Sequence, residues 1–312
     1  MSRSCRFTTL PRLLLVWAIL AVPGIASAGG ETYRLSEGEV VGQLVREYAR
    51  RSDTLMDIAR WLNLGYYDIR RANPDVDLWL PGEGTQVLIP SRYVLPDAPR
   101  KGIVVNLGEL RLFYFREENG EKTVTTYPIG VGRAGLETPL GQTRVTARVD
   151  DPAWYPPEDA RADYARRGSE LPRIVPPGPD NPLGSHAIAL ALDGYLIHGT
   201  NRPDGVGMRV SRGCIRLYPE DIAELIGSVE IGTPVHIVDQ PIKAGLEGGR
   251  LWLEIHRLAD GGPPSAGQTT AVIRRALARA RNGEILLDWQ KLAAALERAD
   301  GIPHAISFLP HD

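Results

Sequence analysis

Short apolar runs separated by turn residues fill the middle of the sequence and restrict the possible folds more than any other feature. Five such segments lie between residues 102 and 240: "GIVVNLGELRLFYF", "KTVTTYPIGVG", "GQTRVTARV", "AIALALDGYLIHG" and "TPVHIV". Strands at this short spacing predict an all-β sandwich or a partly closed barrel. One amphipathic helix, "PEDIAELI", precedes the last segment. The predicted fold class is therefore mainly β.

The first 28 residues have the pattern of a secretory signal peptide. Arginines precede the apolar run "LLLVWAILAV", and Ala26-Ser27-Ala28 forms a small-x-small cleavage site. An uncleaved anchor is the alternative, but an apolar run of about 10 residues is shorter than the roughly 20 that cross a bilayer. We therefore expect export, no transmembrane segment after cleavage, and the loss of Cys5, which leaves Cys214 as the single cysteine.

Residues 29–51 are expected to form a polar lead-in, and residues 52–90 a small module with two helices and a strand. Asp53 or Ser52 can cap the first helix, which Gly65 ends, and Asn73-Pro74 ends the second. The segments "DTLMDIA", "NLGYYDIRRANP" and "LPGEGTQVLIP" resemble the LysM domain, which binds N-acetylglucosamine-containing glycan of cell walls. The usual opening strand is replaced by "YARRSD", and a helical spacer is the alternative interpretation.

Residues 91–101 are interpreted as a linker, residues 102–240 as the β-rich domain and residues 241–312 as a C-terminal extension. The extension combines a short strand pair with two helical patterns, and the sequence does not state its role. Within the β-rich domain, residues 150–187 are rich in proline and glycine and contain Trp154, Tyr155 and Tyr164. A long irregular segment of this kind is either functional or disordered, and we interpret it as a lid over a substrate site.

The charge balance excludes nucleic acid as a partner and gives no support for binding to a membrane surface. The formal net charge is −2 at pH 7, so the chain has neither a basic field for nucleic acid nor a polybasic membrane patch. No HxH, HxxxH or CxxC pair occurs, so the sequence predicts no metal site.

The lone cysteine lies in "RVSRGCIRL", sixteen residues after His198 in "YLIHGTN". In an oxidising compartment a lone cysteine is buried and inert, paired with another chain, or reactive. A reactive thiol needs a base or a cationic neighbour, and imidazole is the usual base. Gly213 permits a tight turn, after which the amides of Gly213 and Cys214 can face an oxyanion. Taken singly, Cys214 fits a small buried hydrophobe and His198 a structural histidine.

Together, "TYPIGVGRAGLETPLGQTRV", "GPDNPLGSHAIAL", "YLIHGTN" and "GMRVSRGCIRLYPEDI" resemble the L,D-transpeptidases of the YkuD type, in particular the periplasmic branch that carries a LysM module. The resemblance runs from about Arg100 to Val238. It implies that Cys214 is the nucleophile, that His198 is its base, and that the carbonyl of Gly199 orients the imidazole. It also implies that Ser211 and Gly213 shape the turn.

Two positions depart from the family pattern. Arg212 stands where the family often has histidine, and Arg216 where it often has asparagine. We expect the charge of Arg212 to favour the thiolate. If the strand is extended, Arg212, Cys214 and Arg216 share a face, so either arginine can grip a substrate carboxylate. The expected substrate-binding residues are Ser211, Arg212, Arg216, Thr200 and Asn201.

The resemblance implies acyl transfer on peptidoglycan in the periplasm, without a metal or an organic cofactor. Cys214 attacks the third residue of a tetrapeptide stem, expected to be diaminopimelate, and releases D-Ala. The acceptor is a stem amine, which gives a 3-3 crosslink, or the lysine of an outer-membrane lipoprotein; water would make the enzyme an L,D-carboxypeptidase. The rival from another class is a non-catalytic wall-binding protein. A papain-like protease is disfavoured because its cysteine precedes its histidine.

Overall fold

The structure is a computed structural model that describes residues 29–35, 38–258, 261–278 and 285–308. The expected signal peptide, residues 1–28, lies outside the described residues. Within the part of the chain that is described, no helix has the length and apolar character of a membrane span.

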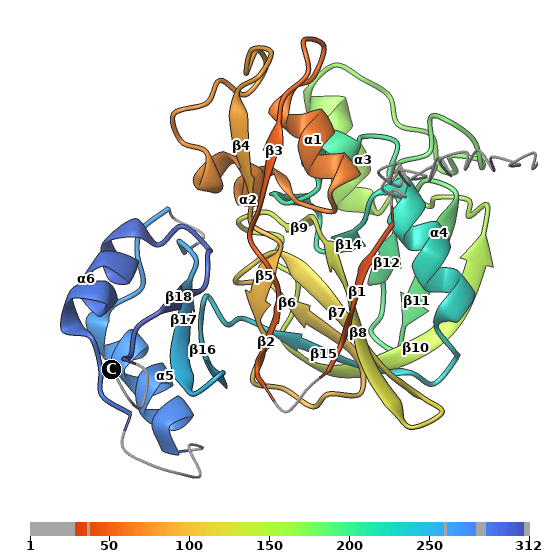
Figure 1. The fold of residues 1–312 in the computed structure, drawn as a ribbon. Coiled ribbons are helices and arrows are strands. Elements are labelled where there is room, and N and C mark those ends of the chain that lie inside the picture. The colour runs from red at the N-terminus through yellow and green to blue at the C-terminus, as the bar shows by residue number, and fades with distance from the viewer. Residues whose placement is uncertain (1–28, 36–37, 259–260, 279–284, 309–312) are drawn as a thin grey trace, which may run out of the picture.

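The centre of the molecule is a curled sheet of nine strands (Figure 1). In spatial order they are β1 (Glu31–Arg34), β8 (Glu121–Pro128), β7 (Arg111–Glu118), β6 (Gly102–Asn106), β15 (Pro234–Val238), β10 (Gly141–Asp150), β11 (His186–Leu190), β12 (Leu196–His198) and β14 (Ile215–Arg216). Neighbours are antiparallel except in the pairs β15–β6 and β12–β14. All five apolar segments of the sequence supply strands of this sheet, so the mainly β fold is confirmed.

One backbone contact partly closes the sheet into a barrel. Gly130 lies two residues after the end of β8, and its N–H and C=O pair with the C=O and N–H of Arg216 in β14, both at 2.8 Å. The edge strand β14 therefore meets the continuation of β8 across the curl. The helix α4 (Pro219–Ser228), which matches the expected "PEDIAELI" helix, buries Ile222 and Leu225 in the core enclosed by the sheet.

The N-terminal region differs from the expected polar lead-in, because it is built of strands. β1 pairs with β8 of the central sheet, β2 (Val40–Gly42) pairs with β5 (Arg92–Val94), and β3 (Val45–Tyr48) pairs with β4 (Gln86–Ile89). The expected linker thus contributes β5. β1 to β5 have three or four residues each, and all of them except β2 carry polar side chains. Each of them pairs with a strand distant in the sequence.

The two expected helices of the small module are present as α1 (Leu55–Trp61) and α2 (Tyr66–Ala72). The expected cap of α1 was wrong. Thr54 caps it in a capping box with Asp57, whereas the carboxylate of Asp53 accepts the N–H of Arg50 at 2.8 Å. The helix also ends earlier than Gly65, which instead begins α2.

The module is docked on the central sheet and on α4. Arg60 of α1 forms two hydrogen bonds with Glu220 at 2.7 and 2.8 Å, and Asn63 donates to the carbonyl of Thr126 at 2.6 Å. Gly65 and Gly207 approach so closely that a Cβ on Gly65 would lie 2.6 Å from the Cα of Gly207. Gly207 belongs to the loop between His198 and Cys214, so the module contacts the chain segment that carries the candidate site.

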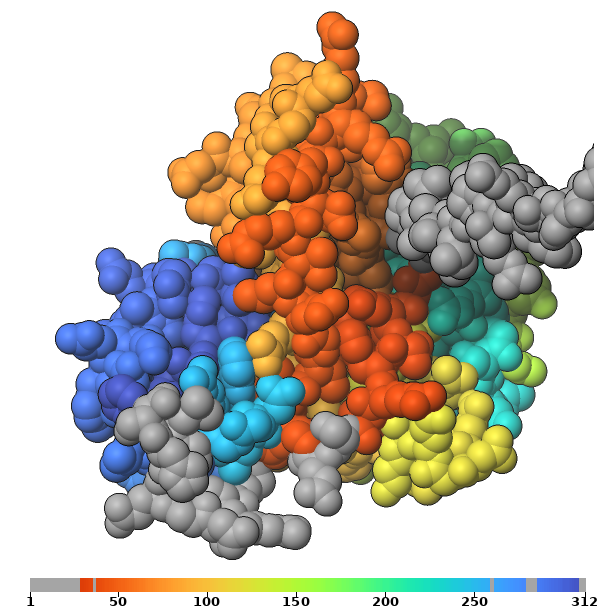
Figure 2. All heavy atoms as spheres, in the orientation of Figure 1, coloured from red at the N-terminus to blue at the C-terminus, as the bar shows by residue number. Residues whose placement is uncertain are grey.

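The C-terminal extension forms a unit with its own hydrophobic core. As expected it holds a strand pair, β16 (Ile242–Glu247) with β17 (Arg250–Ile255), and two helices, α5 (Ala266–Ala278) and α6 (Trp289–Arg298). A short strand, β18 (His304–Ala305), completes its sheet. Figure 2 shows this unit against the N-terminal strands, where Arg92 and Glu247 form an ion pair at 2.7 Å.

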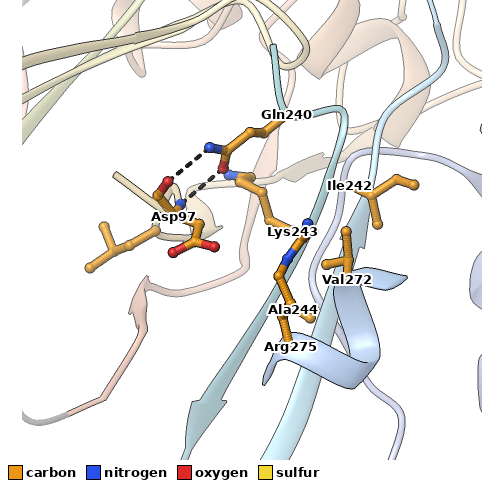
Figure 3. Close-up of a pocket in the computed structure, with 8 residues that line it drawn as sticks. Asp97, Gln240, Ile242, Lys243, Ala244, Val272 and Arg275 are labelled. Atoms are coloured by element: carbon orange, nitrogen blue, oxygen red, sulfur yellow. Dashed lines mark hydrogen bonds between the residues drawn. The ribbon is translucent and has the colours of Figure 1, made fainter. Parts of the chain in front are cut away.

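Further polar contacts lie where the extension meets the preceding segments. Gln240 exchanges two hydrogen bonds with the backbone of Asp97, at 2.9 and 3.0 Å, beside a small cavity of about 80 Å³ (Figure 3). Nearby, the buried ammonium group of Lys243 contacts Glu109 at 2.6 Å and Glu254 at 2.9 Å.

Candidate active site

The barrel closure places the expected nucleophile and base around one cavity. His198 ends β12, and the parallel strand β14 begins one residue after Cys214. A cavity of about 500 Å³ is lined by both residues and by Ser211, Arg212 and Arg216. Arg212, Cys214 and Arg216 all line this cavity, but not through strand parity, because β13 ends at Ser211, β14 begins at Ile215 and Gly213 between them has a positive φ.

Hydrogen bonds of Ser211 fix the turn that presents the thiol. Ser211 ends β13 (Arg209–Ser211), and its hydroxyl donates to the carbonyl of Cys214 at 2.6 Å. The same oxygen accepts the N–H of Gly213 at 3.1 Å. Gly213 has a φ of +109°, and a Cβ there would lie 2.9 Å from the ring of Tyr195. Gly213 is thus required by the turn, but its amide is already bonded, so the prediction that it faces an oxyanion was wrong.

His198 is buried and held in one tautomer. The carbonyl of Gly199 accepts a hydrogen bond from Nδ1 at 2.6 Å, which leaves Nε2 without a proton and able to act as a base. Burial and the positive charge of Arg216 lower the pKa of His198 to about 4, although the backbone groups of Gly199 and Leu183 act in the opposite direction. The imidazole is therefore neutral at pH 7.

Burial raises the pKa of the Cys214 thiol above its ordinary value, and Arg216 and the backbone of Leu196 reduce this effect. The sequence-based expectation that Arg212 stabilises the thiolate was wrong, because the guanidinium of Arg212 is paired with carboxylates elsewhere. At neutral pH the resting site holds a thiol, whose Sγ lies 3.5 Å from the carbonyl oxygen of Gly194, and a neutral imidazole that lines the same cavity. Arg216 favours the thiolate and disfavours the imidazolium.

Arg212 joins the turn to the segment that was interpreted as a lid. A helix that the sequence analysis missed, α3 (Glu158–Arg166), lies inside that segment. Arg212 forms ion pairs with Asp163 at 2.6 Å and with Asp159. The two aspartates are four residues apart, a spacing that places them on one helix face. The prolines and glycines around α3 concealed this pattern.

Trp154, Tyr155 and Tyr164 also line the cavity, as the lid interpretation requires. Thr200 and Asn201 are not among the lining residues; the hydroxyl of Thr200 accepts the N–H of Arg202 at 2.9 Å and shapes the loop. The sequence analysis also missed Arg133, which lines the cavity from the chain after β9 (Val131–Gly132).

The sequence matches known proteins over most of its length. Residues 100–237 fit the model of the YkuD family, the L,D-transpeptidase catalytic domain. The chain is 42% identical over 248 residues to the probable L,D-transpeptidase ErfK/SrfK of Escherichia coli, which covers 78% of this chain and 79% of that protein. The chain belongs to the L,D-transpeptidase family. It is therefore an enzyme of a family that has transpeptidase activity and takes peptidoglycan as its substrate.

Other matches are to L,D-transpeptidases as well. The probable L,D-transpeptidase YcfS of Escherichia coli is 47% identical over 210 residues, which are 65% of each chain. Among solved structures, the catalytic domain of an L,D-transpeptidase from E. faecium is 25% identical, with a TM-score of 0.34, and covers 46% of this chain and 99% of that one.

This L,D-transpeptidase also has a buried cluster outside the cavity that the spacing of its histidines did not reveal. Glu109, Glu254 and His256 place their ligand atoms within 4.8 Å of one another, a geometry compatible with a metal ion. Glu109 is distant in the sequence from Glu254 and His256, so the three residues form no short sequence motif. The ammonium group of Lys243 already contacts both carboxylates and supplies the positive charge there.

Replacing Arg212 with alanine is expected to release α3 from the turn that carries the thiol, because Asp159 and Asp163 lose their shared partner. Backbone amides of residues 158–166 should then exchange with deuterium about tenfold faster, a change of about 1.4 kcal/mol in the local opening free energy. Arg166→Ala is the matched control: it removes another partner of Asp163, but one whose side chain is 72% exposed, and it should change exchange much less. Equal exchange rates in wild type and Arg212→Ala would contradict the conclusion that Arg212 holds α3 against the turn that carries Cys214.

Proposed function

We propose that this chain is a periplasmic L,D-transpeptidase that uses Cys214 as its nucleophile and His198 as its base. The observation that carries the proposal is the convergence of both side chains on one cavity, with the imidazole fixed by the Gly199 carbonyl. The substrate is a tetrapeptide stem of peptidoglycan. The attacked carbonyl is that of its third residue, diaminopimelate.

In the first half-reaction, Nε2 of His198 takes the thiol proton while the sulfur of Cys214 attacks the carbonyl carbon. The C–N bond to D-Ala then breaks, the imidazolium returns its proton to the leaving amine, and a thioester remains on Cys214. In the second half-reaction an acceptor amine attacks the thioester. A C–N bond forms, the C–S bond breaks, and the amine proton passes through His198 to restore the thiol.

Arg216 is the residue to which we assign substrate binding beside the thiol. Its side chain lines the cavity, and among the ion pairs of the described residues its guanidinium has no carboxylate partner. A guanidinium at the cavity wall without such a partner is suited to bind a carboxylate of the stem. Arg212 is occupied by Asp159 and Asp163, so we assign it to the lid.

The LysM-like module is proposed to bind the glycan of the same wall. Trp61, Trp79 and Leu80 of this module are exposed by 48%, 60% and 81%, and exposed apolar and aromatic side chains of this kind support contact with sugar rings. The proposed acceptor is the amine of a second stem or the lysine of an outer-membrane lipoprotein.

The test is the intact mass of the mature protein after incubation with a disaccharide-tetrapeptide. We expect a mass gain equal to the muropeptide minus D-Ala, absent in Cys214→Ser. Hydrolysis without transfer to any amine would make the enzyme an L,D-carboxypeptidase. A folded protein with a free thiol that forms no adduct and releases no D-Ala would contradict the catalytic proposal and favour a non-catalytic wall-binding protein.

A further inference from the structure

A second and larger cavity lies where the module, the central sheet and the C-terminal unit meet. It measures about 680 Å³ and is bordered by α2, by the strands β9 and β13, and by Arg257, Leu258 and Gly261, which follow β17. In Figure 1, α2 lies directly beside β9 and above the C-terminal unit. The cavity is lined by five arginines and two glutamates: Arg70, Arg71, Arg133, Arg209, Arg257, Glu109 and Glu137.

The two glutamates do not neutralise this cavity. Glu109 is engaged by the ammonium group of Lys243 at 2.6 Å and by the amide of Asn106 at 2.5 Å. Glu137 is exposed and accepts the N–H of Gly135 at 2.8 Å. Neither carboxylate forms an ion pair with an arginine of the cavity, so the described lining residues carry an excess of positive charge.

Most of the arginines contact groups that carry no negative charge. Arg209 donates to the carbonyl of Leu107 at 2.8 Å, Arg257 to that of Arg298 at 3.4 Å, and Arg70 to that of Pro74 at 2.9 Å. Arg71 stacks over the ring of Tyr67, with 4.6 Å between its Cζ and the ring centroid. Among the ion pairs of the described residues, only Arg133 of these five arginines has a carboxylate partner, Asp163, at 3.5 Å.

Arg71 and Arg257 come from different units and repel each other. Burial is the main cause that lowers the pKa of Arg71, the charge of Asp68 and the ring of Tyr67 raise it, and the charge of Arg257 lowers it slightly. Asp68 offsets part of the repulsion between the two guanidinium groups, and an anion bound between them would offset more of it.

The cavity adjoins the active site. Arg133 lines both cavities, and β13 runs from Arg209 in this one to Ser211 in the other. A ligand held by the arginines therefore lies next to the turn that presents Cys214.

We propose that this arginine-lined cavity binds the carboxylates of the acceptor, a second peptidoglycan stem that bears at least two of them. This inference rests on the proposed function. Stem peptides carry several carboxylates on a flexible chain, and planar guanidinium groups bind carboxylates through two parallel hydrogen bonds. The cavity thus selects and orients the acceptor while Arg216 acts on the donor.

The first test separates the two half-reactions in the full mature chain. The double variant Arg71→Gln/Arg257→Gln should form the acyl-enzyme within about twofold of the wild-type rate, yet transfer the acyl group to a free tripeptide stem about tenfold more slowly or worse. Transfer to glycinamide, which has no carboxylate, should be unchanged. Arg46→Gln/Arg274→Gln is the control. Both arginines are exposed and lie outside the cavity, and the two substitutions remove the same amount of charge as Arg71→Gln/Arg257→Gln.

Unchanged transfer to the stem in the double variant would overturn the inference while leaving the proposed function intact. Failure of wild type to acylate would contradict the proposed function instead. The cavity is then tested by titrating the Cys214→Ser protein with the tripeptide stem, whose affinity should fall about tenfold or more on adding Arg71→Gln/Arg257→Gln. Equal affinity in both proteins, or complete displacement of the stem by inorganic phosphate at equal concentration, would contradict a carboxylate-specific site. Thermal melting verifies that each variant is folded.

Discussion

Replacing His198 with glutamine is expected to slow acyl-enzyme formation at pH 7 by about 100- to 10,000-fold, the usual contribution of a positioned general base. The reason is the resting protonation state. Burial raises the pKa of the Cys214 thiol, so little thiolate is present at neutral pH, and the reaction depends on proton transfer to Nε2. The rate of adduct formation, followed by intact mass, measures the loss.

The pH profile distinguishes a lost base from a distorted site. In wild type the base works when the imidazole is unprotonated, so the rate should fall only as the pH drops toward the His198 pKa of about 4. In His198→Gln the rate should instead rise about tenfold per pH unit up to the raised thiol pKa, because only thiolate reacts. A variant whose rate stays low and flat across this range would contradict the assignment of His198 as the base.

Replacing Arg111 with alanine is expected to destabilise the protein by about 3–5 kcal/mol, as the loss of one partner from a buried ion pair does. Arg111 is 1% exposed, pairs with Asp68 of α2 at 2.9 Å and donates to the carbonyl of Asn63 at 3.2 Å. Its guanidinium also lies 4.2 Å from the ring centroid of Tyr93. The variant leaves Asp68 without its cation, so the loss should appear as a lower urea midpoint.

Arg116→Ala is the control for this prediction. It lies on the same strand, β7, but its partner Glu118 is 71% exposed, so its removal should cost less than about 1 kcal/mol. Equal effects of the two substitutions would show that Arg111 does not anchor the module to the sheet.

The sequence predicted the elements that depend on local patterns. Alternating apolar runs identified most strands of the central sheet, and Asn73-Pro74 ended α2 where expected. The strands β1, β2, β3 and β5 were missed because each has only three or four residues and a partner remote in the sequence, so no local pattern marks them.

The same division applies to the site. His198 and Cys214 were predicted because each stands in a short motif at a fixed separation. The pairing of Arg212 with α3 depends on contacts between residues about fifty positions apart, and the arginine cavity draws its charge from three units. The thiol pKa was predicted in the wrong direction because the number of nearby arginines does not reveal how far burial outweighs them.

The backbone and the side chain of Arg216 have separate roles. Its backbone pairs with Gly130 and closes the barrel, whereas its side chain supplies a charge to the cavity. Any residue other than proline has the same backbone groups, so substitution at this position can change the charge beside the thiol without opening the barrel. Natural variation can therefore retune the chemistry of this enzyme at position 216 independently of the scaffold that holds it.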